Sequence, residues 1–98
     1  MTLDQFNVLE RVVLQAADRG VRARTLTHLA ETHRGTRDPK VAGLLARVVR
    51  NEEETRDIRL IAYFVLFEVA GRPLQQIPPL DQLRFPDGLD WAFVDSHL

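Results

Sequence analysis

The chain contains no cysteine among its 98 residues. This absence excludes disulfide bonds, thiolate nucleophiles and cysteine-based zinc sites, and it slightly favours a reducing compartment. No apolar run reaches the roughly 18–20 residues that are needed to span a bilayer. Residues 1–10 include two acids and no base, so they lack the basic start of a signal peptide. We therefore expect a cytoplasmic protein that makes no membrane contact.

Signatures of catalysis and of ligand binding are also missing. There is no nucleophile elbow, no glycine-rich phosphate loop and no His–acid pair at catalytic spacing. His28 and His33 are five residues apart, whereas a zinc-binding pair on a helix requires a spacing of four. We expect an exposed His28, a partly buried His33, no metal, no cofactor and no enzymatic activity.

The residues that are present indicate one globular domain, with 45% hydrophobic and 28% charged side chains. The net charge of −1 conceals an asymmetry between the two halves. Residues 1–50 hold nine Lys and Arg against five acids, and residues 51–98 hold four Arg against nine acids. Such a distribution favours either an anionic partner for the first half or charge-complementary self-association.

The most apolar segment is Ile58–Ala70, which includes eight consecutive apolar residues from Leu60 to Phe67. A helix that is apolar on all sides must be buried on all sides. A strand is the alternative because β-branched and aromatic residues are frequent here, but no second strand exists to pair with it. We expect a central helix over 52–70, with Glu52–Glu54 in its first turn.

Three shorter amphipathic helices precede this segment. The predicted fold is all-α, a small four-helix domain with helices over about 3–18, 25–33, 39–50 and 52–70. Val8 and Val12 broaden the apolar stripe of the first helix, and Gly20 is expected to end it. Asp38 followed by Pro39 is the clearest helix start in the chain.

The core is predicted to span residues 1–71, and residues 72–98 form an extended C-terminal arm interrupted by prolines. The arm is rich in apolar residues and is expected to end in a short helix, 91–97. It either packs on the core or docks on a partner subunit. The candidate docking or dimer contacts are Phe64, Phe67, Phe85, Trp91 and Phe93.

The pair of helices 25–33 and 39–50 is loosely similar to a helix-turn-helix unit. Lys40, Arg47 and Arg50 form a stripe opposite the apolar face of the second helix, as a recognition helix requires. The candidate residues for binding a partner or nucleic acid are Arg22, Arg24, Arg37, Lys40, Arg47 and Arg50. However, no wing follows the pair, and the Ala–Gly spacing of such units is wrong by one residue.

The predicted function is a non-enzymatic protein–protein interaction module of the adaptor, inhibitor, immunity or assembly-chaperone type, which acts by binding or occlusion. A protein partner is expected, with a homodimer as one form of it, in a bacterial or phage setting. The alternative is a helix-turn-helix DNA-binding regulator that dimerises.

Overall fold

The chain is all-helical in the computed structural model, which describes residues 1–79 and 81–98. The elements are α1 (Leu3–Gln15), α2 (Arg19–His33), α3 (Pro39–Arg50), α4 (Arg56–Ala70), the short 3-10 helix η1 (Leu74–Gln76) and α5 (Trp91–Asp95). None of the described residues belongs to a strand. The predicted fold class is therefore confirmed, and the segment that begins at Ile58 is a helix.

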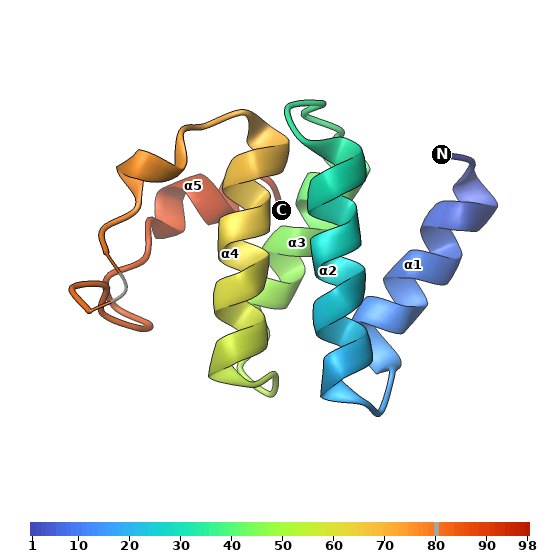
Figure 1. The fold of residues 1–98 in the computed structure, drawn as a ribbon, viewed down its shortest axis with the longest axis horizontal. Coiled ribbons are helices and arrows are strands. Elements are labelled where there is room, and N and C mark those ends of the chain that lie inside the picture. Colours follow the sequence, from blue (N-terminus) through green and yellow to red (C-terminus); the bar gives the residue numbers. More distant parts are fainter. Residues whose placement is uncertain (80) are drawn as a thin grey trace.

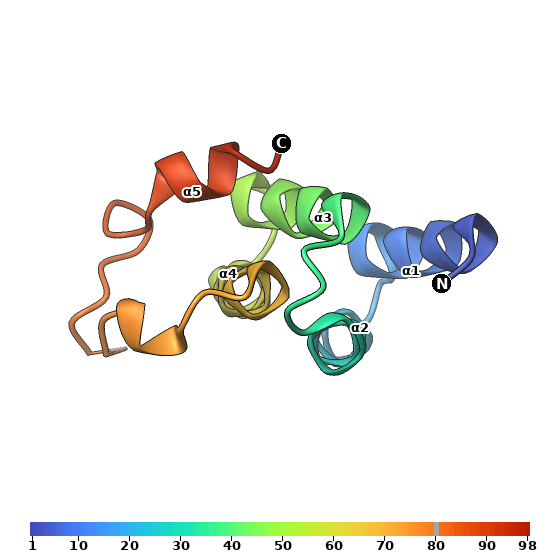
Figure 2. The same ribbon diagram turned by 90° about the horizontal axis from the view of Figure 1, so that it is seen from above.

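The helices form two layers. Seen from above, α1, α3 and α5 lie in one layer, and α2 and α4 lie in the other (Figure 2). Consecutive helices among the first four run in opposite directions (Figure 1). Towards its N-terminal end, α1 diverges from α2, and the N-terminus lies on the opposite side of the molecule from the loops of the C-terminal segment (Figure 1).

The burial of the helices is very unequal. Seven of the twelve residues of α3 and eight of the fifteen residues of α4 are buried. In α1 only two of thirteen residues are buried, Phe6 and Val13. A helix gains most of its stability from packing of its apolar face, so α1 is the least firmly attached of the four long helices.

The boundary between the first two helices differs from the prediction. α1 ends at Gln15 rather than near Asp18, and α2 begins at Arg19 rather than at Thr25. The reason is that Asp18 caps α2, accepting hydrogen bonds from the backbone N–H groups of Gly20 and Val21. Gly20 therefore lies in the first turn of α2 and does not end α1.

The start of α4 also differs from the prediction. Its N-cap is Thr55, whose hydroxyl accepts from the N–H of Ile58, so the helix begins at Arg56 rather than at residue 52. Asn51 instead accepts from the N–H of Glu53 and shapes a turn after α3. The acidic run 52–54 thus lies in the α3–α4 loop, outside the first turn of α4.

The C-terminal end of α4 is capped by another part of the chain. Gly71 adopts the left-handed conformation expected of it, with φ of 74°. In addition, the N–H of Gly35 donates to the carbonyl of Glu68 at 2.8 Å, and the N–H of Arg37 donates to the carbonyl of Val69 at 2.9 Å. The α2–α3 loop therefore supplies donors for carbonyls that have no partner within the helix.

The segment after α4 lies against the core in this structure. Ile77, Leu83, Leu89 and Val94 are buried within the same apolar cluster as α3 and α4. The hydroxyl of Tyr63 on α4 accepts a hydrogen bond from the N–H of Asp90 at 2.9 Å. These contacts cover the outer side of α4, the side that α2 and α3 leave open.

Candidate interaction surfaces

The six basic residues that the sequence singles out do not form one patch. Arg22 is a structural residue. Its guanidinium donates hydrogen bonds to both carboxylate oxygens of Glu54 at 3.0 Å and to the carbonyl of Ala16 at 2.6 Å. Only 15% of its side chain is exposed. It ties the end of α1 to the α3–α4 loop, which leaves little of its charge for a partner.

The two arginines on the outer stripe of α3 are engaged in ion pairs. Arg47 pairs with Glu10 of α1. Arg50 donates to both oxygens of Asp95 on α5, and its guanidinium lies 4.1 Å from the centroid of the Trp91 ring. Both side chains are still about half exposed, but each positive charge is matched by a carboxylate of the same chain.

The remaining three basic residues, Arg24, Arg37 and Lys40, are exposed. Arg24 is on α2, whereas Arg37 lies beyond the far end of that helix, in the loop that caps α4. Arg37 has a positive φ of 57°, which is unusual for a residue with a side chain. The positive charge is therefore spread over different parts of the surface.

The aromatic residues that the sequence offers as docking contacts mostly contact one another. Phe67 is buried, with its ring centroid 5.0 Å from that of Tyr63 and 4.6 Å from that of Phe93. The guanidinium of Arg72 lies 4.7 Å from the Phe67 ring and 4.4 Å from the Phe93 ring. This cluster attaches the C-terminal segment to α4.

The other three docking candidates are half-buried. Phe64 packs edge-on against Tyr63, and Phe85 lies under the guanidinium of Arg59 at 4.8 Å. The indole N–H of Trp91 donates to the carbonyl of Pro86. Within this chain the contacts of Phe85 with Arg59 and of Trp91 with Arg50 therefore hold the C-terminal segment in place, which is the alternative to partner docking, whereas the Phe64 contact lies within α4.

The Arg50–Asp95 pair predicts an acid-sensitive contact of α5. The hydrogen bonds from Arg50 hold the pKa of Asp95 below its usual range. Because the folded-state pKa is lowered, this contribution is present at neutral pH and is lost as the pH falls below about 4. We expect the emission of Trp91, the sole tryptophan, to change in this range. Fluorescence titration measures the change, and Asp95→Asn should abolish it. A persisting transition in that variant would contradict the assignment.

The sequence reasoning missed the surface of α1. Among the described residues the exposed large hydrophobic side chains are Met1, Leu3, Val8, Leu74 and Leu98. Three of these five lie on the first part of α1 or just before it. Val8, which the periodicity assigned to a broad apolar stripe, is 57% exposed. Val8 lies on the side of α1 opposite the buried residues Phe6 and Val13, which face the core.

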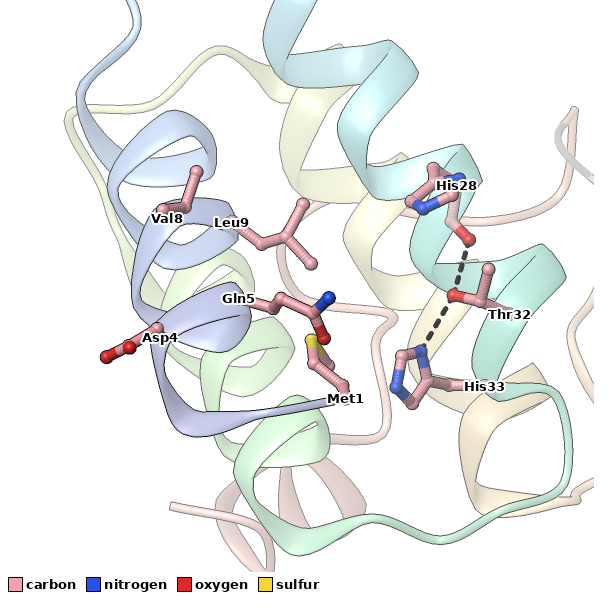
Figure 3. Close-up of a pocket in the computed structure, with 8 residues that line it drawn as sticks. All are labelled: Met1, Asp4, Gln5, Val8, Leu9, His28, Thr32 and His33. Carbon is pink, nitrogen blue, oxygen red and sulfur yellow. Dashed lines mark hydrogen bonds between the residues drawn. The ribbon is translucent and has the colours of Figure 1, made fainter.

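An apolar groove lies between α1 and the C-terminal half of α2 (Figure 3). Its volume is about 610 Å³, and its lining includes Met1, Gln5, Val8, Leu9 and His33. Gln5 and Leu9 point towards α2 and Met1 lies in the space between the two helices, whereas Asp4 points away from the groove (Figure 3). The groove is open to solvent.

The histidines of α2 lie on the other wall of this groove. As expected, His28 is exposed and His33 is partly buried. The Thr32 hydroxyl donates to the backbone carbonyl of His28 and lies 2.8 Å from Nδ1 of His33. Among residues 1–79 and 81–98, no three His, Cys, Asp or Glu side chains gather where they could hold a metal ion.

A second groove, of about 880 Å³, runs over α3 on the opposite side of α1. Leu3 and Phe6 form one wall, residues 96–98 form the other, and Gly43 belongs to the floor. A Cβ atom at Gly43 would lie 3.2 Å from the carbonyl oxygen of His97, so glycine permits the close approach of the C-terminal residues. α3 is thus recessed between α1 and the C-terminal segment.

Burial also affects a tyrosine under the C-terminal segment. It raises the pKa of the Tyr63 hydroxyl above its ordinary value, although the hydrogen bond from the N–H of Asp90 acts in the opposite direction. That bond gives the hydroxyl a hydrogen-bond partner within the chain. The raised pKa therefore reflects the packing of Tyr63 under the C-terminal segment.

Comparison of the chain with protein-family models, with curated proteins and with solved structures gave no match. No helix in the part of the chain that the structure describes is long and apolar enough to cross a membrane. A function must therefore be argued from the surfaces described above.

Proposed function

We propose that the protein is a non-enzymatic interaction module that binds another polypeptide through the α1 surface. We define the α1 surface as residues 1–15 together with the walls of the two grooves beside them. The observation that carries this proposal is the exposure of Met1 and Val8 beside one groove and of Leu3 beside the other, on or just before a helix that buries only two of its own residues. Exposed apolar patches of this kind mark interaction sites.

Covering this surface would be favourable. Full burial of a Val, Leu or Met side chain is worth about 1.5–3 kcal/mol. Met1 and Val8, which line the groove beside α2, are 52% and 57% exposed, so a partner that covers both would gain roughly 2 kcal/mol from them. The apolar groove between α1 and α2 suits an α-helix that presents apolar side chains at intervals of three and four residues. Binding there would block a surface of the partner, as inhibitors do, or link the partner to another molecule, as adaptors do.

The DNA-binding alternative has less support. A recognition helix must project into the major groove and offer free basic side chains. Arg47 and Arg50 are paired with Glu10 and Asp95, and α3 is recessed between α1 and the C-terminal segment. These contacts reduce the positive charge and the protrusion that the helix-turn-helix interpretation needs, so we favour the protein partner.

Site-specific photo-crosslinking tests the proposed function. The photoreactive residue p-benzoylphenylalanine is placed at Val8 on the α1 surface or at Thr27, an exposed position on α2 outside the groove lining. In cells that express the chain we expect a discrete adduct from position 8 and none from position 27. Mass spectrometry should map the adduct to a helical segment with an apolar face. Equal labelling from both positions, or none from position 8, would refute the proposal.

A further inference from the structure

We infer that the polypeptide bound at the α1 surface is a second copy of this chain, with the two α1 helices antiparallel and crossing near Val8. This inference rests on the proposed function and specifies its partner. The observations that carry it are a regular outward stripe on α1 and the placement of two opposite charges on that stripe.

The outward stripe of α1 follows the spacing of helix-pairing residues. Asp4, Val8, Arg11 and Gln15 are separated by four, three and four positions, and all four side chains are exposed. This alternation keeps the four residues on one side of α1, at the spacing along which two helices can pack side by side, with Val8 as the apolar residue and charged residues on both sides of it. Phe6 and Val13, which attach α1 to its own core, lie on the other side.

The charges on this stripe are self-complementary. Asp4 and Arg11 lie on either side of Val8, and neither forms an ion pair with any other residue that the structure describes. Figure 3 shows the Asp4 carboxylate directed away from the molecule's own groove. When two copies of α1 run antiparallel about Val8, Asp4 of each helix faces Arg11 of the other, and the two Val8 side chains meet.

This arrangement selects both the partner and its orientation. A parallel pair of α1 helices would place Asp4 beside Asp4 and Arg11 beside Arg11, which is repulsive. A two-fold symmetric contact uses the same patch twice, so one acid and one base on either side of the axis satisfy each other in both copies. The position of α1 at the edge of the molecule, away from the loops of the C-terminal segment, leaves room for this approach (Figure 1).

Charge exchange on the stripe tests the inference. Asp4→Arg gives a stripe with two bases, and Arg11→Glu gives a stripe with two acids. Each variant should repel its own copies and weaken self-association at least about tenfold, whereas an equimolar mixture of the two should associate again. Sedimentation equilibrium at about 100 μM measures this, since a dimer with a Kd of about 10 μM is mostly assembled at that concentration.

The matched control uses α2, where Arg24 and Glu31 are also exposed and seven residues apart. Arg24→Glu and Glu31→Arg should leave self-association unchanged. Circular dichroism of every variant checks that the helices remain folded. A monomeric wild type, stripe variants that associate as before, or a mixture that stays monomeric would overturn the inference.

The crosslinking experiment separates this inference from the proposed function. An adduct from position 8 with twice the 11.2 kDa mass of the chain supports a second copy. An adduct of any other mass leaves the α1 surface as an interaction site and refutes the second copy. The absence of any adduct from position 8 refutes both.

Discussion

Replacing Arg22 with alanine is expected to lower the free energy of unfolding by about 3 kcal/mol, because it leaves Glu54 without its partner in a site with little water access. The side chains of Arg22 and Glu54 are only 15% and 8% exposed. The same guanidinium also donates to the carbonyls of Ala16 and Ala17, at the end of α1. Urea denaturation followed by circular dichroism measures the loss.

A double-mutant cycle and a control pair make this prediction specific. Arg22→Met and Glu54→Gln, alone and together, should give a coupling energy of about 1–3 kcal/mol. Arg34 and Glu68 form the comparison, since they are also an arginine–glutamate pair but Arg34 is 69% exposed. Arg34→Ala should cost less than about 0.5 kcal/mol. If Arg22→Ala and Arg34→Ala lower the free energy of unfolding by the same amount, Arg22 does not have the structural role described above.

Replacing Arg59 with alanine is expected to cost about 2–4 kcal/mol, although Arg59 has no carboxylate partner among the described residues. Its side chain is buried, and it donates to the carbonyl of Val49 at 2.8 Å. Val49 lies in the last turn of α3, where carbonyls have no partner within the helix and favour a nearby positive charge. The substitution removes that donor and also opens a cavity beside Phe85.

Arg56 supplies the control for this second prediction. Its guanidinium is 6.0 Å from the same Phe85 ring, but its side chain is exposed. Arg56→Ala should change stability by less than about 0.5 kcal/mol. Arg59→Lys should retain part of the stability, because an ammonium group can still reach a carbonyl but does not stack as a guanidinium does. Urea denaturation followed by Trp91 fluorescence reports the result. Equal effects of Arg56→Ala and Arg59→Ala would refute this account.

Local chemistry in the sequence was sufficient wherever an element is specified by neighbouring residues. Thr2 and Gln5 form the expected capping box, with hydrogen bonds of 2.9 and 3.1 Å. Asp38 caps α3, and Gly71 ends α4 in the left-handed conformation. Each of these signals involves residues within a few positions of one another, so periodicity and capping preferences predict them directly.

Local signals were misleading where two interpretations compete for the same residues. Gly20 suits the end of one helix, but Asp18 before it suits the start of another, and the structure follows Asp18. Glu54 suits a helix N-terminus, but its carboxylate binds Arg22, which is 32 positions away in the sequence. A bond over that distance depends on how the α1–α2 and α3–α4 connections meet, and no local pattern contains that information.

The amino-acid sequence by itself determined the all-helical class, the apolar helix at 58–70, the absence of thiol chemistry and the unequal charge of the two halves. Only the tertiary structure decided which of these charges and rings remain available. Arg22, Arg47 and Arg50 are paired within the chain, and Phe67 and Phe93 pack against each other. Val8 is left exposed on the side of α1 opposite Phe6 and Val13. The physical reason is that residue type determines what a side chain can bind, whereas the packing of the helices determines which possible partners lie within contact distance.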